Sequence, residues 1–297
     1  MPTKSASWLN KNKLFSNRTK RTLINTLLLL FIFYIVLCVI LFFFQERLIF
    51  FPEKLHKDYR FSFPGKFEEI KIQTADKKVL NGVLFKSDSS KGLVFYLHGN
   101  AGSINSWGEV APTYTNLNHD VFILDYRGYG KSESSIKNQE EFFQDVQIAY
   151  DSLKNRYDED QIVVLGFSIG SGPATKLAST NNPKLLILEA PYFSLTDMMK
   201  HRFRIFPPFL LKYKFRTDEF IKACKMPIVI FHGDRDEVIY YGSSLKLKQL
   251  LKETDTLITL KGQSHNGIAE NLDYKSELHR ILSHYNGKSK PEENQPE

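Results

Sequence analysis

One serine in this sequence stands where a catalytic nucleophile could stand. Ser168 is the middle residue of a Gly-x-Ser-x-Gly sequence, Gly166 to Gly170, which directly follows the apolar run 162–165. A serine at such a strand-to-helix turn is typical of a nucleophile elbow, where strained backbone angles project the hydroxyl into a cleft. The hydroxyl needs a histidine base and a carboxylate that orients the base, because its own pKa is too high for attack. We therefore predict a nucleophilic role for Ser168; a glycine-rich turn with an incidental serine is the alternative.

The carboxylate and the base are expected on two later loops. The apolar run 227–231 predicts a buried strand, and the loop after it contains Asp234 and Asp236. We favour Asp236 because it lies deeper in the loop, within reach of the next one; Asp234 is the alternative, and its simpler role is that of a turn former. His265 stands one strand later, in a polar loop, and the order serine, acid, histidine is known for such triads. We therefore expect His265 to be the base.

Two backbone amides could bind the negative charge that develops on a carbonyl oxygen during attack. Such a charge needs fixed donors close to the nucleophile. The amide of Ile169 lies at the amino end of the helix predicted after the elbow, and the amide of Asn100 lies in the loop His98 to Gly102, after the apolar run 93–97. We predict that Ile169 and Asn100 form the oxyanion hole and that His98 braces the loop.

Alternating strands and helices predict the scaffold that brings these loops together. Residues 46–285 are enough for one large domain with a sizeable core. Their order predicts an α/β fold, in which an initial antiparallel hairpin is followed by a mostly parallel sheet, eight strands in all, flanked by helices. Strands are expected near 67–73, 79–86, 92–97, 120–125, 161–166, 184–189, 226–231 and 255–260, and helices near 103–116, 138–155, 169–180, 240–252 and 272–284.

At these residues the sequence resembles the α/β-hydrolase superfamily, and in particular the membrane-anchored alpha/beta-hydrolase-domain serine hydrolases near the S33 peptidase and lysophospholipase branches. The segments that carry the resemblance are 98–102, 125–132, 166–170, 189–192, 232–238 and 264–265. The resemblance implies the α/β-hydrolase fold and a Ser-Asp-His triad that works without a cofactor or a metal. It leaves esterases, thioesterases, lipases and peptidases open, because one fold hosts them all. One departure is Ile239, where members often have proline.

The N-terminal part of the sequence predicts a membrane anchor. Leu23 to Phe44 is a run of 22 residues without a charge. At about 1.5 Å per residue, a helix of this length crosses a hydrocarbon core of roughly 30 Å. A buried core helix is one alternative and a secretory signal peptide is another, but the run ends at Gln45 without a small-residue cleavage site. We therefore predict an uncleaved signal anchor.

Basic residues before the anchor predict its orientation. Six cations and no acidic residue precede Glu46: Lys4, Lys11, Lys13, Arg18, Lys20 and Arg21. The positive-inside rule then places segment 1–22 in the cytoplasm, the anchor at 23–44, and the hydrolase domain, 46–285, on the non-cytoplasmic side, which is the periplasmic face of the inner membrane in a bacterium. Residues 286–297 are polar and are expected to be a disordered tail.

The distribution of charge along the chain excludes nucleic acid as a partner. The net charge is +7, of which six charges belong to the basic segment, so the folded domain is close to neutral and lacks a basic binding stripe. A nucleotide is excluded too, because the Gly-Lys-Ser at 130–132 lacks the earlier glycine of a phosphate-binding loop. Cys38 falls in the anchor and Cys224 in the domain, so no disulfide is expected.

An insert at about 192–220 predicts a short helical lid. Aromatic and aliphatic residues alternate with basic ones, and Pro207-Pro208 is expected to divide the insert into two short helices. One interpretation is an apolar acyl pocket that faces the serine, formed by Phe203, Phe206 and Phe209, with a cationic outer face on anionic headgroups. The other is a small helical hairpin that only packs on the core.

Together these features predict a membrane-anchored serine hydrolase that cleaves carboxylic ester or thioester bonds of lipophilic acyl substrates. Its expected partners are the lipid or small-molecule substrate and the membrane lipids. One alternative is an S33-type serine peptidase, although a cationic lid suits the amino terminus of a peptide poorly. The other is a non-catalytic binding or scaffold protein on the same fold.

Overall fold

The computed structural model of the protein describes residues 17–286, which form two units that divide between Gln45 and Glu46. The first unit consists of most of the helix α1, Asn17–Ile49. From Thr19 onward this helix is long and apolar enough to cross a membrane, with a mean hydropathy of 3.3 over its most apolar window. The predicted anchor therefore lies within one helix, whereas Lys4, Lys11, Lys13 and residues 287–297 of the predicted tail lie outside the described residues.

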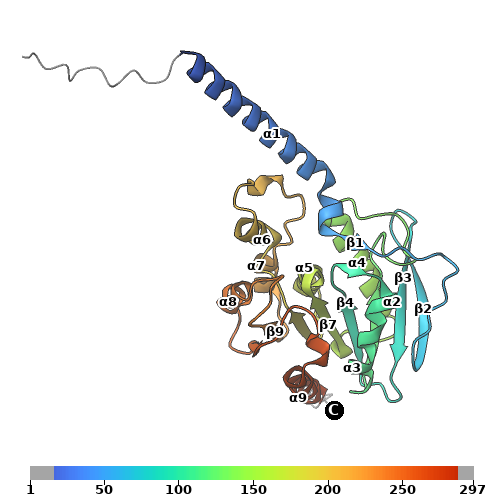
Figure 1. Ribbon diagram of the computed structural model, residues 1–297. Helices are drawn as coiled ribbons and strands as arrows, with labels where there is room; N and C mark the ends of the chain where they lie inside the picture. The colour runs from blue at the N-terminus through green and yellow to red at the C-terminus, as the bar shows by residue number, and fades with distance from the viewer. Residues whose placement is uncertain (1–16, 287–297) are drawn as a thin grey trace, which may run out of the picture. The chain divides into compact units, whose positions relative to one another are not determined.

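The second unit is built on a sheet of eight strands in the order β10-β9-β8-β7-β4-β6-β3-β2 (Figure 1). The strands are β2 Lys66–Gln73, β3 Val79–Lys86, β4 Leu93–Leu97, β6 Asp120–Leu124, β7 Ile162–Phe167, β8 Leu185–Glu189, β9 Ile228–Gly233 and β10 Thr256–Leu260. Only β3 runs antiparallel to its neighbours, β2 and β6. The predicted initial hairpin and mostly parallel eight-stranded sheet are confirmed. A separate pair of two-residue strands, β1 Phe51–Pro52 and β5 Ala101–Gly102, was not predicted.

Helices cover both faces of the sheet, and a hydrophobic core lies under each layer. Side chains of α4, α5 and α8 belong to one core, and side chains of α2, α3 and α9 belong to the other. The helices are α2 Ile104–Trp107, α3 Ala111–Thr115, α4 Gln139–Leu153, α5 Ser171–Thr180, α6 Leu195–Arg202, α7 Thr217–Phe220, α8 Gly242–Lys248 and α9 Leu272–Asn286.

The helix predicted at 103–116 is divided in the structure. A 3-10 turn, Gly108–Val110, separates α2 from α3. Pro112 stands in the first turn of α3, where no hydrogen bond from its backbone nitrogen is needed. In the middle of a continuous helix the same proline would remove a hydrogen bond and interrupt the helix. Gly108 is needed here because a Cβ would stand 2.3 Å from the ring of Phe63. The sequence pattern therefore predicted helix correctly but missed the break.

The insert contains the two short helices that were predicted, α6 and α7, but they are far apart. Residues 203–216 separate them, and within this stretch only Pro208–Leu210 form a 3-10 turn. The ring of Pro208 disfavours helical angles at the residue before it, and Pro207 is extended, with φ −71° and ψ 136°. The stretch is therefore a loop, which carries most of the basic and aromatic residues of the insert.

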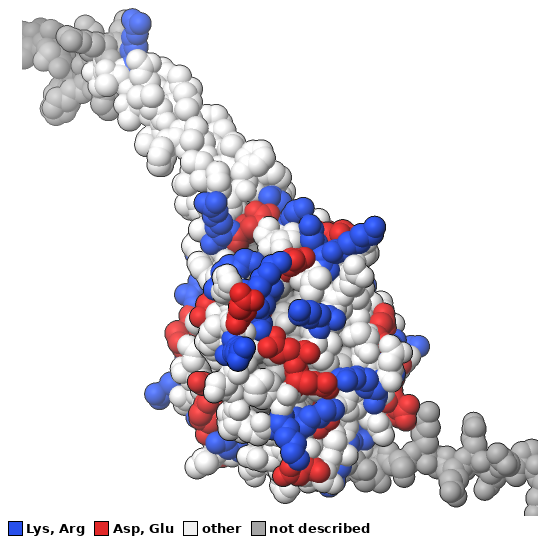
Figure 2. All heavy atoms as spheres, turned by 90° about the vertical axis from the view of Figure 1, so that its right-hand side faces the viewer, with Lys and Arg blue, Asp and Glu red and all other residues white. Residues whose placement is uncertain are grey.

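Charges of both signs are mixed on the surface of the second unit. Figure 2 shows Lys and Arg interspersed with Asp and Glu on one face of this unit, and uncharged residues along most of α1. No extended patch of a single sign appears on that face. This distribution agrees with the near-neutral domain deduced from the sequence.

A buried carboxyl group at the end of β8 links the sheet to α3 and α9. The side chain of Glu189 accepts hydrogen bonds from the hydroxyl groups of Tyr114, at 3.1 Å, and Tyr274. Burial raises the pKa of Glu189 to about 7, although both hydrogen bonds act in the opposite direction. The folded protein therefore favours the protonated form of this side chain, so its contribution to stability is complete below about pH 4.5 and declines as the pH rises through about 7.

We expect Glu189→Gln to make the unfolding free energy less dependent on pH between 5 and 8. A pKa displacement of this size corresponds to at most about 3 kcal/mol, and the amide keeps one oxygen acceptor for the tyrosines. Thermal unfolding of the full chain in detergent, at several pH values, measures the difference between variant and wild type. Glu253→Gln, at an exposed position, is the control. If the unfolding free energies of Glu189→Gln and wild type change with pH in parallel, the titration of Glu189 does not contribute to the pH dependence of stability.

Candidate active site

The turn after β7 holds Ser168 in a strained backbone conformation. Its φ is +52°, which an L-residue adopts only when the surroundings force it. Two glycines make the turn possible: a Cβ at Gly166 would lie 2.5 Å from the Gly170 carbonyl oxygen, and one at Gly170 would lie 2.1 Å from the Leu97 carbonyl oxygen. A 3-10 turn, Ser168–Gly170, then leads into α5. This is the geometry of a nucleophile elbow, predicted from the Gly-x-Ser-x-Gly sequence.

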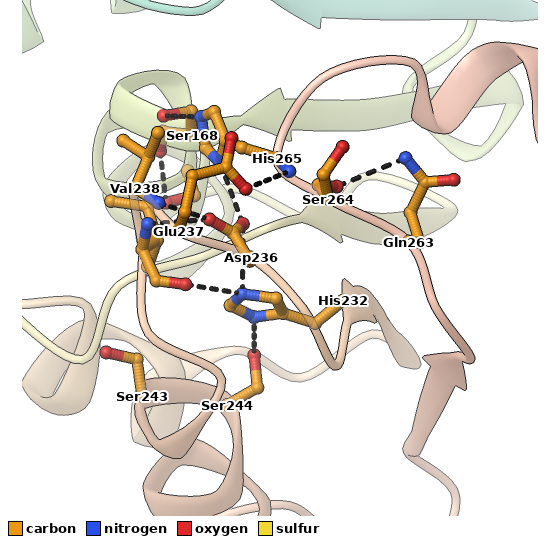
Figure 3. A network of polar contacts seen from close by, with 12 residues as sticks. Ser168, His232, Asp236, Glu237, Val238, Ser243, Ser244, Gln263, Ser264 and His265 are labelled. Atoms are coloured by element: carbon orange, nitrogen blue, oxygen red, sulfur yellow. Dashed lines mark hydrogen bonds and ion pairs between the residues drawn. The ribbon is translucent and has the colours of Figure 1, made fainter.

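The structure brings Ser168, His265 and Asp236 into one chain of hydrogen bonds (Figure 3). The Nε2 atom of His265 lies 3.0 Å from the Ser168 Oγ atom, and its Nδ1 atom lies 2.7 Å from Asp236 Oδ2. The carboxylate can only accept, so Nδ1 donates to it, and Nε2 is left to accept from the serine hydroxyl. Asp234 instead accepts a bond of 2.6 Å from the backbone amide of Gly262, which stabilises the loop.

All acceptor positions of Asp236 are directed at fixed donors. Oδ1 accepts from the amides of Val238 and Ile239, both at 2.8 Å. Oδ2 lies 2.7 Å from His265 and 3.2 Å from Nε2 of a second histidine, His232. Burial opposes ionisation of Asp236, but the hydrogen bonds from His232 and His265 outweigh it and hold the pKa of the carboxyl well below its usual range. The aspartate is therefore ionised and held in one orientation.

His232 is a member of this network that the sequence did not reveal. It lies at the end of β9 and is fully buried. Its Nδ1 atom is 2.6 Å from the hydroxyl of Ser244, and its Nε2 atom is 3.0 Å from the Ile239 carbonyl oxygen. Because that carbonyl only accepts, Nε2 carries the proton, and the Ser244 hydroxyl donates to Nδ1. The one available signal was a histidine at the end of a strand, four residues before the acid.

The loop after β4 carries Asn100, one of the two predicted oxyanion donors; the other, Ile169, directly follows the serine. The hydroxyl of Tyr129 donates to the Asn100 carbonyl oxygen at 2.5 Å, and the Phe51 amide donates to the Asn100 side chain at 3.2 Å. The strand β1 pairs with this loop through Phe51 and Ala101. These contacts fix the backbone of the loop.

His98 lies at the base of the same loop. It is fully buried, its Nδ1 atom is 2.7 Å from the Gly99 carbonyl oxygen, and its ring stacks on that of Trp107. Burial lowers the pKa of His98 to about 4, so the ring is neutral near pH 7. These contacts suit the bracing role predicted for it.

The chain is similar to several known proteins. Residues 88–219 match the family described as serine aminopeptidase, S33. The lysophosphatidylserine lipase ABHD12 of Macaca fascicularis is 30% identical over 231 residues, which cover 69% of this chain and 58% of that protein. Protein bem46 of Schizosaccharomyces pombe is 33% identical over 189 residues, which cover 60% of this chain and 63% of that protein. The matched parts thus span less than two thirds of both relatives.

Solved structures show the same fold. The esterase Pf2001 of Pyrococcus furiosus superposes with a TM-score of 0.64 at 18% identity and covers 80% of this chain and 98% of its own. Est1E from Butyrivibrio proteoclasticus, described with bound ferulic acid, has a TM-score of 0.63 at 19% identity and covers 74% of this chain and all of its own. The chain has the α/β-hydrolase fold.

The insert at 192–220, the predicted lid, divides into packed ends and an exposed middle. Tyr213 and Phe215 are fully buried in the core. Phe203 is 59% exposed and Phe209 is 77% exposed, whereas Phe206 is half-buried. Phe203 and Phe209 therefore face solvent, which departs from their predicted place in an acyl pocket, because the loop 203–216 carries them away from the core. Only Phe206 remains a candidate for that role.

The lid helix of the hydrolase is fastened to the loop that carries Asp236. The guanidinium of Arg202, at the end of α6, donates to the carbonyl oxygens of Glu237 and Val238. Asp197, in the first turn of α6, accepts from Lys246 at 2.6 Å and from the Tyr240 hydroxyl. The position of α6 is therefore linked to that of the acid loop. Among residues 17–286 of the hydrolase, no group of three His, Cys, Asp or Glu side chains is arranged to hold a metal ion.

Proposed function

We propose that this hydrolase uses Ser168, His265 and Asp236 to cleave ester or thioester bonds of lipophilic acyl substrates. The observation that supports this most directly is the hydrogen-bonded chain from Ser168 through His265 to an ionised Asp236, at a strained strand-to-helix turn. Backbone strain at the serine costs stability, so it calls for a functional reason. Catalysis by a triad explains the strain, the histidine tautomer and the buried carboxylate together.

The proposed reaction has two halves. In the first, the Ser168 proton passes to Nε2 of His265 while Oγ attacks the carbonyl carbon, and the amides of Ile169 and Asn100 stabilise the oxyanion. The imidazolium, stabilised by Asp236, then gives the proton to the departing alcohol or thiol, and an acyl-enzyme remains. In the second half His265 takes a proton from water, which attacks the acyl carbon. The bond from that carbon to Ser168 Oγ then breaks, His265 returns the proton to Oγ, and the acid is released. These steps need no cofactor.

The lipophilic character of the substrate rests on three features. From Thr19 onward, the helix α1 is long and apolar enough to cross a membrane. One relative is described as a lysophosphatidylserine lipase. Of the two similar structures, Pf2001 is described as an esterase and Est1E is described with bound ferulic acid. Phe206, half-buried in the lid, offers an apolar contact for an acyl chain. A peptidase, which the family description would allow, needs acidic groups for a substrate amino terminus, whereas residues 198–217 contain none.

We also propose that α1 crosses the membrane once and places the hydrolase unit on the non-cytoplasmic side. The first turns of α1, which starts at Asn17, contain Arg18, Lys20 and Arg21, and three further cations precede the helix in the sequence. Basic residues close to one end of a span favour the cytoplasm for that end. The active site would then lie outside the cytoplasm, next to the membrane that α1 crosses.

The chain-length preference tests the substrate class. We expect the wild-type protein in membranes to cleave long-chain monoacyl esters with a higher kcat/KM than acetyl esters. Phe206→Ala should lower kcat/KM for the long-chain esters by about tenfold, since one apolar contact contributes about 1–3 kcal/mol to discrimination. Acetyl esters, which do not reach the side chain, should change little.

Phe220→Ala is the matched control, because Phe220 is another half-buried aromatic residue of the insert but packs on Phe143. It should affect long and short esters equally. If Phe206→Ala also lowers both activities by the same factor, the side chain does not contact the acyl chain. If the wild type cleaves peptides faster than any acyl ester, the peptidase alternative is correct.

A further inference from the structure

The loop of the lid exposes three large apolar side chains within seven residues. The exposed fractions are 59% for Phe203, 71% for Ile205 and 77% for Phe209. We call these three residues the apolar tip. Single exposed apolar residues are ordinary, but a cluster of them on a loop marks a surface that interacts with something apolar.

Basic residues flank the apolar tip in the sequence. From residue 198 to residue 217 the sequence has no acidic residue and six cations, Lys200, Arg202, Arg204, Lys212, Lys214 and Arg216. We call these six residues the cationic collar. Among the described ion pairs, three of them, Lys200, Arg204 and Lys214, have no carboxylate partner, and Arg202 is bound by carbonyl groups. Exposed apolar side chains with cations close to them in the sequence are complementary to a bilayer surface that contains anionic lipids.

Contacts within the second unit hold this loop close to the point where the chain leaves α1. The ammonium group of Lys212 is 2.9 Å from the Glu46 carboxylate, and the ring of Tyr213 packs edge-on against Phe50, with 5.2 Å between the centroids. Glu46 is the first charged residue after the apolar run that ends at Phe44. Three residues span at most about 11 Å, so Phe209 cannot be far from Lys212.

We propose that the apolar tip inserts into the interfacial region of the membrane that α1 crosses, while the cationic collar contacts anionic headgroups. The inference rests on the proposed membrane span and adds a second site of contact with the same bilayer. A residue that follows a membrane span directly lies at the bilayer surface, so the ion pair between Glu46 and Lys212 brings the loop to that surface as well. The lid would then meet its lipid substrate in the interface, where acyl chains and headgroups are both within reach.

Bromolipid quenching of a tryptophan placed in the tip tests the contact. The full chain carrying Phe209→Trp is reconstituted into vesicles of phosphatidylcholine and phosphatidylglycerol, with and without brominated acyl chains. The control is Leu272→Trp, because Leu272 is 80% exposed and lies at the start of α9, far along the chain from the lid. The signal of the two native tryptophans is subtracted with the wild-type protein. We expect quenching of the tip tryptophan to exceed that of the control by about threefold or more, since an interfacial side chain is buried to about 5–10 Å.

A second pair of variants tests the collar. Lys200→Gln with Arg204→Gln should reduce the quenching of the tip tryptophan in anionic vesicles to the level seen in phosphatidylcholine alone. The control exchanges two exposed lysines outside the insert, Lys225→Gln with Lys261→Gln, and should leave quenching unchanged. Equal effects of the two pairs would show that only net charge matters and would overturn the role of the collar.

The outcomes separate this inference from the proposed catalysis. All quenching measurements are repeated with Ser168→Ala, which removes turnover and should leave the membrane contact as it is. If the tip tryptophan is no better quenched than the control, the tip does not enter the bilayer. Shielding from acrylamide without quenching by bromolipid would show instead a contact with protein, such as a second copy, and would also overturn the inference. Extraction of the wild-type chain by alkaline carbonate would show that α1 does not span the membrane, and the inference, which rests on that span, would then be wrong.

Discussion

Replacing Ser168 with alanine is expected to abolish labelling by a fluorophosphonate probe and to lower kcat for any acyl ester by about five orders of magnitude or more. The variant keeps His265, Asp236 and the oxyanion donors but has no oxygen that can attack the carbonyl carbon. The residual rate should therefore come only from binding and oxyanion stabilisation. Labelling of native membranes followed by a direct assay of ester hydrolysis measures both effects on the full chain.

The control for this variant is Ser179→Ala, on the helix α5 that follows the elbow, where the hydroxyl donates to the Lys176 carbonyl oxygen in the described contacts. It should be labelled at the wild-type rate. Labelling that persists in Ser168→Ala would place the nucleophile elsewhere. A folded wild-type protein that no fluorophosphonate labels would favour the non-catalytic scaffold, and the apolar tip would then have to serve attachment alone.

The second large effect is expected for Asp236→Asn, with a loss of about 10⁴-fold in kcat and a small change in KM. The two backbone amides of Val238 and Ile239 hold one oxygen at the Oδ1 position, so the new amide group must turn towards the histidines. A donor in that place forces His265 to carry its proton on Nε2, and this nitrogen can then no longer accept the proton of Ser168.

Asp234→Asn is the matched control, because it alters the neighbouring carboxylate of the same loop. Asp234 accepts only from the Gly262 amide in the described contacts, and an asparagine oxygen can still accept that bond. We expect its activity to stay within a few-fold of wild type. Steady-state kinetics of both variants on one long-chain ester decide between the two aspartates. A larger loss for Asp234→Asn would reverse the assignment.

Local patterns predicted the fold and the proposed triad because each depends on short segments. The apolar runs 162–165 and 227–231 are long enough for buried strands, and the loops after them had to meet at one edge of a parallel sheet. The order of Ser168 and His265 along the chain then gave their roles. The strand β9 continues two residues beyond its apolar run because His232 and Gly233 still pair with β10, and side-chain type does not report such pairing.

Features that depend on distant contacts could not be predicted. His232 contributes to the site because the Ile239 carbonyl oxygen, seven residues further on, fixes its tautomer, and Ser244 on α8 holds its other ring nitrogen. The sequence also does not show that Phe209 is exposed and Phe215 is buried. Both are phenylalanines in one basic stretch, and the path of the loop decides which of them reaches the core. The pairing of β1 with β5 joins residues about 50 positions apart through two residues a side.

That short pairing sets where a soluble form of the protein can begin. Phe51 and Pro52 pair with the loop that carries Asn100, and the Glu53 amide donates to the Gly102 carbonyl oxygen at 2.9 Å. A cut between Gln45 and Phe50 releases the domain with this strand in place. A cut at the start of β2, where the regular sheet begins, removes β1 and leaves the loop that carries Asn100 without one of its supports. We therefore expect a chain that starts between Gln45 and Phe50 to keep the Asn100 loop in place, and a chain that starts at β2 to lose part of its support.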